Sequence, residues 1–221
     1  MQENIFGIFS SFITKILTCL NIFSFYDILK PKAIPIIFER ISTMFKAFYP
    51  YEYEDSVFSI DYEKLYEKGF RGIIFDIDNT LVPHGADSTE EVDGFFRYIQ
   101  GLGFKTLLLS NNDDARVQRF LKNIDSLYVC DAEKPSPKGY LKAVDMLGLS
   151  KNQVVVIGDQ VFTDVYGANR SGLTSILVKY IGYGTTANAG RRRKLENFVL
   201  YFYKRNKSCF GRLGGIHRKE T

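Results

Sequence analysis

Two pairs of carboxylates follow apolar segments of the chain. Asp76 and Asp78 stand two residues apart at the end of one segment, and Asp159 and Asp164 close another. Two carboxylates this close repel each other unless a cation or a proton lies beside them. A divalent cation and a bound proton are both useful in phosphoryl transfer, so this spacing indicates that kind of chemistry.

Other polar groups in the sequence suit a phosphate. Ser110 and Asn111 follow a third apolar segment and open a predicted helix, where backbone N–H groups favour an anion. Lys134, in Lys-Pro-Ser-Pro, adds a cation. Taken singly, a strand-end Asp is usually a helix N-cap, a lysine before proline is a solvated charge and Ser-Asn-Asn is a turn. Their joint occurrence at one edge of a predicted sheet favours a catalytic site.

An alternation of apolar runs and helix signals predicts the elements that position these groups. The expected strands are residues 72–76, 106–110, 127–130, 153–159 and 175–178. The expected helices are residues 61–69, 88–100, 113–122 and 137–148, and one ending near residue 172. Apolar strands that alternate with helices predict a doubly wound α/β domain with a parallel sheet. Its ligand site is expected at the carboxyl ends of the strands.

Four motifs resemble those of the haloacid dehalogenase (HAD) superfamily. They are DIDNT at 76–80, LLLS at 107–110, Lys134 and GDQVFTD at 158–164, in the family's order. The resemblance covers residues 52–180 and implies a Rossmann-like fold and phosphatase activity with Mg²⁺. It implies that Asp76 is the nucleophile, forming an aspartyl-phosphate, and that Asp78 is general acid and then base.

The resemblance implies roles for the remaining motif residues as well. Ser110, Asn111 and Lys134 are expected to bind phosphate, with Lys134 also orienting the nucleophile. Mg²⁺ is expected on Asp76, Asp159 and the backbone carbonyl of Asp78, an oxygen set that this ion prefers. Thr80 and Asp164 are expected to contact these ligands rather than the substrate, and for Asp164 the alternative is binding to the metal through a water molecule.

The spacing of the motifs leaves no room for a cap domain. Residues 81–109 and 111–133 hold one predicted helix and one strand each. An uncapped site is open to a bulky substrate. Within the uncapped group, the chain is similar to YqeG-like phosphatases through DIDNTLVP at 76–83, SNN at 110–112, KPSPKGY at 134–140 and GDQVFTDVYGANRSG at 158–172. That branch resembles phosphatidylglycerophosphate phosphatases, which implies a phospholipid headgroup as substrate.

The two ends of the chain differ in character. Residues 4–29 and 37–48 show amphipathic patterns, interrupted by Lys15 and several hydroxyl side chains, which disfavours a membrane span. They predict either a hairpin at a bilayer interface or helices docked on protein. Residues 191–221 hold ten Lys or Arg and two Glu, a net charge of +8, whereas residues 1–190 hold 19 basic and 23 acidic residues, a net charge of −4.

These patterns predict three regions. They are a helical extension over 1–50, a phosphatase domain over 51–182 and a basic, aromatic tail over 183–221. The tail could meet an anionic membrane, or be a solvated helix or a disordered end. Nucleic acid is disfavoured because the body is acidic and no base-reading module is visible. Three widely spaced cysteines and two histidines predict neither a disulfide framework nor a histidine-rich metal site.

We therefore expect a cytoplasmic phosphatase, with peripheral association at the inner membrane face as a hypothesis. The alternatives are a soluble phosphatase of nucleotide or sugar phosphates and a non-catalytic protein that keeps the HAD fold.

Overall fold

The computed structural model describes residues 39–40, 42–182 and 191–218. The chain divides into two compact units, Met1–Met44 and Phe45–Thr221. The amphipathic pattern predicted at 4–29 lies outside the described residues. In the first unit, the Thr43 hydroxyl donates to the Glu39 carbonyl at 2.9 Å, as in a helical turn. No helix among the described residues has the length and apolar character needed to span a bilayer.

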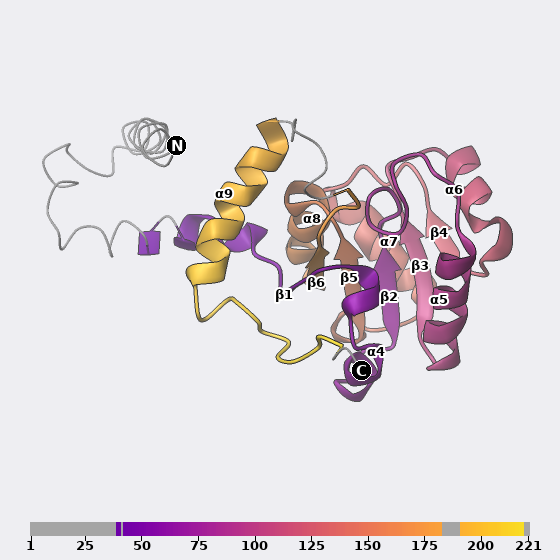
Figure 1. Ribbon diagram of the computed structural model, residues 1–221, viewed down its shortest axis with the longest axis horizontal. Helices are drawn as coiled ribbons and strands as arrows, with labels where there is room; N and C mark the ends of the chain where they lie inside the picture. Colours follow the sequence, from indigo (N-terminus) through magenta and orange to yellow (C-terminus); the bar gives the residue numbers. More distant parts are fainter. Residues whose placement is uncertain (1–38, 41, 183–190, 219–221) are drawn as a thin grey trace, which may run out of the picture. The chain divides into compact units, whose positions relative to one another are not determined.

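Within the described residues, six strands form one parallel sheet (Figure 1). The strands are β1 Glu52–Glu54, β2 Gly72–Phe75, β3 Lys105–Leu109, β4 Leu127–Val129, β5 Val154–Gly158 and β6 Thr174–Val178. Their order is β1-β6-β5-β2-β3-β4, and every neighbouring pair is parallel. The five predicted strands and the doubly wound α/β class are confirmed. Strand β1 was not predicted, because three residues with Glu at both ends carry no apolar signal.

Helices connect the strands and flank the sheet. The α-helices of the second unit are α4 Tyr62–Glu67, α5 Glu90–Gly101, α6 Asp114–Phe120, α7 Pro137–Leu147, α8 Tyr166–Arg170 and α9 Arg191–Arg205. Short turns of other helix types are η1 Lys46–Phe48, η2 Val57–Ser59, η3 Leu121–Asn123, η4 Lys151–Gln153 and η5 Val161–Val165. Side chains of Asp61, Thr89 and Asp113 cap α4, α5 and α6 by accepting backbone N–H groups.

The two faces of the sheet bury separate apolar cores. On one face, Ile73 and Phe75 of β2 pack with side chains from α4, α5 and α6. On the other face, Ile74 of β2 packs with side chains from α7 and α8. Because successive side chains of a strand point to opposite faces, a strand buried on both faces must be apolar throughout. This is why β2 and β5 read as continuous apolar runs.

The strand order places β2 and β5 side by side at the centre of the sheet. The chain runs from β2 outward through β3 to β4 and then returns to β5, so the connections after β2 and β5 leave in opposite directions. Phe75 pairs with Ile157, and the Asp76 N–H donates to the Ile157 carbonyl at 3.0 Å. Such a switch point is where doubly wound sheets bind ligands.

The connections around this switch point contain no cap domain. Between β2 and β3, all of whose residues the structure describes, α5 is the only α-helix or strand. Between β3 and β4, which are also fully described, the chain forms α6 and the short turn η3. The carboxyl edge of the sheet is therefore not covered by an inserted domain.

Helix α9 packs at the β1 edge of the sheet. Its residues Val199, Phe202 and Tyr203 are buried. The Tyr203 ring lies 5.7 Å from the ring of Tyr49, measured between centroids. Residues 191–205, in the segment predicted as a basic tail, thus form a helix that joins the core of the second unit.

Candidate active site

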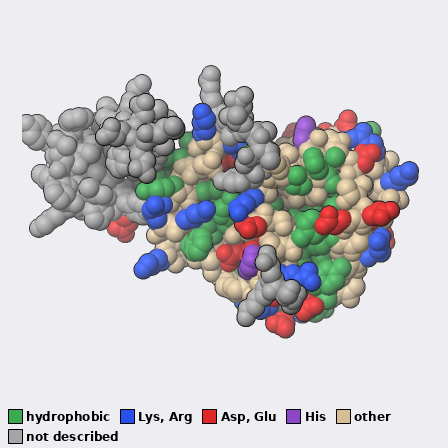
Figure 2. All heavy atoms as spheres, in the orientation of Figure 1, with side chains coloured by type: hydrophobic (Ala, Val, Ile, Leu, Met, Phe, Trp, Pro, Cys, Tyr) green, Lys and Arg blue, Asp and Glu red, His purple; other side chains and the backbone are tan. Residues whose placement is uncertain are grey.

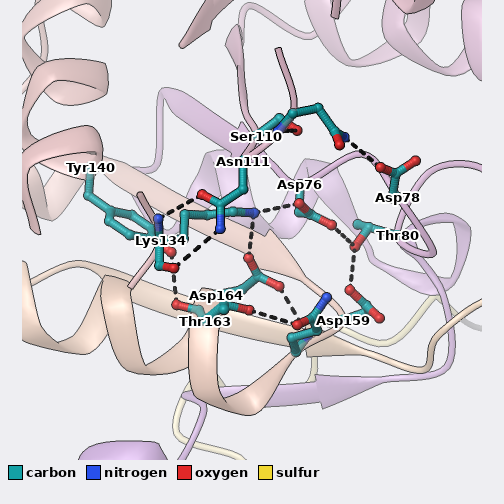
Figure 3. A network of polar contacts seen from close by, with 12 residues as sticks. Asp76, Asp78, Thr80, Ser110, Asn111, Lys134, Tyr140, Asp159, Thr163 and Asp164 are labelled. Carbon is teal, nitrogen blue, oxygen red and sulfur yellow. Dashed lines mark hydrogen bonds and ion pairs between the residues drawn. The ribbon is translucent and has the colours of Figure 1, made fainter. Parts of the chain in front are cut away.

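Three buried aspartates converge at the carboxyl ends of β2 and β5 (Figure 3). Asp76 follows β2, Asp159 follows β5, and Asp164 lies in the η5 turn. One carboxylate oxygen from each lies within 4.8 Å of the others. Gly158 permits this approach, since a Cβ there would lie 2.4 Å from Cγ of Asp164. The sequence patterns named all three residues, and the fold brings them together.

Lys134 supplies a buried cation to this cluster. Its Nζ donates to Asp76 Oδ1 at 2.5 Å and to Asp164 Oδ1 at 2.8 Å. Burial by itself would lower the pKa of Lys134, but the charges of Asp164 and Asp76 outweigh it, so the pKa is raised. Lys134 is therefore charged and bridges two carboxylates.

Asn111 holds the loop that carries Lys134. Its Oδ1 accepts the Lys134 backbone N–H at 2.7 Å, and its Nδ2 donates to the Lys134 carbonyl at 3.2 Å. Asn111 thus positions the lysine in this geometry, and its direct contact with phosphate stays a prediction. Ser110 is buried, and its Oγ accepts the Asn112 N–H at 3.1 Å. Its phosphate contact is likewise a prediction.

Burial dominates the electrostatics of the aspartates. It raises the pKa of Asp76 to about 6, with Lys134 opposing the shift and Asp164 adding to it. The pKa of Asp159 is raised to about 8 by burial and by the charges of Asp76 and Asp164, against Arg193. At both aspartates, burial and the neighbouring negative charges favour the protonated form more strongly than the nearby cations oppose it.

Thr80 lies between two of these carboxylates. Its hydroxyl donates to Asp76 Oδ2 at 3.0 Å, and Asp159 Oδ1 lies 3.4 Å from the hydroxyl oxygen of Thr80. These two carboxylate oxygens therefore converge on one place, as Figure 3 shows. Buried carboxylate oxygens are the donors that Mg²⁺ prefers, so the donor set fits this ion.

Asp78 binds to a separate group of partners. Its Oδ1 accepts from the Gly85 N–H at 2.9 Å and from Arg116 Nη2 at 3.0 Å. Its Oδ2 accepts from Asn112 Nδ2 at 2.6 Å. Burial alone would raise the pKa of Asp78, but the hydrogen bonds from these three donors outweigh it and the pKa is lowered. Asp78 is held as a carboxylate in this state.

Sequence reasoning did not predict three of the contacts that the motif aspartates make. Asn112 and Arg116 bind Asp78, and Arg193 of α9 binds Asp159. Asn112 lies in the SNN motif at 110–112, Arg116 lies in the helix predicted at 113–122, and Arg193 was one of many basic residues near the C-terminus. Nothing in their spacing from the aspartates distinguishes them, since the contacts are tertiary.

Comparison with known proteins agrees with this geometry. A family model described as a haloacid dehalogenase-like hydrolase matches residues 87–172. The probable phosphatase YqeG of Bacillus subtilis is 36% identical over 161 residues, covering 72% of this chain and 94% of that protein. With its uncapped parallel sheet and the acidic cluster at the switch point, the chain belongs to the haloacid dehalogenase-like hydrolase family.

Two further proteins are similar to part of this chain. The identity to YqeG places the chain in the branch of YqeG-like phosphatases, as its motifs had indicated. The chloroplast and mitochondrial phosphatidylglycerophosphate phosphatase 1 of Arabidopsis thaliana is 28% identical over 131 residues, covering 54% of this chain and 37% of that protein. A cobalt-bound deoxy-D-mannose-octulosonate 8-phosphate phosphatase from Haemophilus influenzae is 16% identical, with a TM-score of 0.40 over 63% of this chain and 91% of that chain.

Proposed function

We propose that the chain is a Mg²⁺-dependent phosphomonoesterase that works through an aspartyl-phosphate on Asp76. The observation that carries this proposal is that the two carboxylate oxygens of Asp76 have different partners. One of its oxygens binds Lys134, and the other faces Asp159 beside Thr80. A carboxylate with a buried lysine on one oxygen and a metal position at the other is set up to act as a nucleophile toward phosphorus.

The residues would act in two steps. In the first, an Asp76 oxygen forms a bond to phosphorus while the bond from phosphorus to the leaving-group oxygen breaks. The leaving-group oxygen takes a proton from Asp78. In the second, Asp78 removes a proton from water, whose oxygen attacks phosphorus and releases phosphate from Asp76. General acid–base catalysis of this kind contributes typically about 10²–10⁴-fold. The substrate's anionic phosphoryl group would raise the pKa of Asp78 and favour the protonated form required first.

Asp76, Asp159 and the Asp78 carbonyl would hold the metal ion. Bound there, Mg²⁺ would neutralise charge on the phosphoryl oxygens under attack. Lys134 would bind the same phosphoryl group, together with Ser110, while Asp164 keeps the lysine in place.

We further propose phosphatidylglycerophosphate as the substrate. The plant relative named for this activity and the uncapped site support this choice. Helix α9 adds support, because its Leu195 and Tyr201 are exposed. Figure 2 shows Lys and Arg side chains on the surface in the region of this helix. Among the α9 side chains that the structure describes, the exposed basic residues are Arg192, Lys194, Lys204 and Arg205. An anionic lipid surface attracts such a helix by about 1 kcal/mol for each Lys or Arg near it.

This proposal assigns a purpose to each region of the chain. Residues 51–182 would carry the chemistry, and residues 1–50 and 183–221 would bring it to the inner face of the membrane as a peripheral protein. Removal of residues 1–48 is then expected to reduce cosedimentation with lipid vesicles. Undiminished sedimentation of the shortened chain would refute the anchoring role of those residues.

The direct test is phosphate release with and without Mg²⁺. Wild type and Asp76→Asn are compared on phosphatidylglycerophosphate in mixed micelles and on soluble nucleotide and sugar phosphates. We expect Mg²⁺-dependent turnover by wild type only, with preference for the lipid. Turnover retained by Asp76→Asn would overturn the aspartyl-phosphate mechanism. Preference for soluble esters would keep the mechanism and overturn the lipid substrate, and no turnover on any ester would favour a non-catalytic role.

A further inference from the structure

Arg193 of helix α9 contacts the aspartate at the end of β5. Its Nη1 donates to the Asp159 carbonyl at 2.8 Å and to Glu196 Oε2 at 2.8 Å. Its Nη2 forms an ion pair with Asp159 Oδ2. The guanidinium also lies over the Tyr180 ring, 4.6 Å from its centroid. These contacts hold both the backbone and the side chain of Asp159.

The contact leaves one oxygen of Asp159 for another partner. Arg193 takes Oδ2, while Oδ1 lies near the Thr80 hydroxyl. Asp76 shows the same division, since Lys134 takes its Oδ1 and its Oδ2 accepts from Thr80. Each carboxylate thus has one oxygen held by a cation and the other turned toward the common position beside Thr80.

The arginine is itself fixed. Glu196, one turn further along α9, is buried and binds Nη1. Only 21% of the Arg193 side chain is exposed, and none of the Asp159 side chain. A guanidinium presents donors in a rigid planar fork, so contacts to two groups set the orientation of what it binds. Carboxylates that bind metals are commonly oriented by hydrogen bonds of this kind.

We propose that Arg193 is a positioning residue for the metal site, holding Asp159 so that its Oδ1 points to the place where Mg²⁺ binds. Helix α9 lies outside residues 87–172, which the family model matches, and on this proposal it is part of the catalytic apparatus. This inference rests on the proposed function, because it takes Asp76 and Asp159 as the metal ligands.

The test measures Mg²⁺ binding to the full-length protein by isothermal titration calorimetry, independently of turnover. Arg193→Gln is compared with wild type and with Arg205→Gln, which makes the same charge change at the exposed far end of α9. Loss of a group that orients a metal ligand typically weakens metal affinity about 10–100-fold. We expect a rise of the Mg²⁺ Kd in that range for Arg193→Gln and no change for Arg205→Gln.

Arg193→Lys covers the case in which Arg193→Gln does not fold. It keeps the charge but cannot hold the carbonyl and Oδ2 of Asp159 in one plane, so we expect an intermediate Kd. A wild-type Kd in Arg193→Lys would refute orientation by the fork. A wild-type Kd in folded Arg193→Gln would mean that Arg193 only anchors α9. A Kd below that of wild type would mean that Arg193 competes with the metal for Asp159. Either result would overturn the proposal.

One control separates this inference from the proposed function. If wild type binds no Mg²⁺, or if Asp76→Asn binds it with the same Kd, the assigned metal site itself is wrong. If wild type binds Mg²⁺ and Asp76→Asn does not, the site stands, and the Arg193 variants alone decide whether α9 shapes it.

Discussion

The substitution Asp76→Asn should make the metal-free protein more stable, although it removes the proposed nucleophile. The pKa of Asp76 is raised from 3.8 to about 6, chiefly by burial, so folding favours the protonated form. The resulting stability is fully present below pH 3.8 and is lost as the pH rises through 6. At about 1.4 kcal/mol for each tenfold change in proton affinity, keeping Asp76 ionised at pH 8 costs about 3 kcal/mol.

The assay is urea denaturation in EDTA at pH 8 and pH 5. At pH 8 we expect Asp76→Asn to unfold with a free energy up to about 3 kcal/mol above that of wild type, and at pH 5 about half that gain. Asp125→Asn, at an exposed aspartate, serves as the control and should show no such gain. Saturating Mg²⁺ should stabilise wild type, because ligands that bind only the folded state do so, and stabilise Asp76→Asn much less. A variant less stable than wild type at pH 8, or a difference independent of pH, would refute this reasoning.

Three further changes test other parts of the site. Lys134→Met should lower the free energy of unfolding at pH 8 by about 3–5 kcal/mol, because it leaves buried carboxylates without their cation. Lys138→Met, at an exposed lysine, is the control in the same denaturation assay. Gly158→Ala places a Cβ 2.4 Å from a buried aspartate side chain and should destabilise by about 1–3 kcal/mol in thermal unfolding, so an unchanged Tm would argue against this close packing. The pair Lys194→Gln and Arg205→Gln removes two exposed charges of α9 and should weaken cosedimentation with anionic vesicles by up to about 2 kcal/mol, with equal binding to neutral vesicles as the internal reference.

Local patterns in the sequence predicted most of the sheet and the motif residues of the site. Strands β2 and β5 are apolar at every position because both faces of the sheet are covered, and that run is visible in the sequence. Polar residues directly after such runs stand at the carboxyl edge, so Asp76 and Asp159 could be assigned to one site before the structure was known. Strand β1 was not predicted, because its position depends on pairing with β6 and its own sequence shows no strand pattern.

The tertiary structure alone decided which side chains control these aspartates. Asp76 and Asp159 are adjacent because β2 and β5 are neighbours in the sheet, an order that local periodicity does not encode. Arg116, 38 residues away, helps to hold Asp78 as a carboxylate, and Arg193, 34 residues away, binds Asp159. Periodicity and spacing report on interactions within a few residues, whereas the pKa of a buried carboxyl depends on every charge and donor within a few ångströms, whatever its place in the chain.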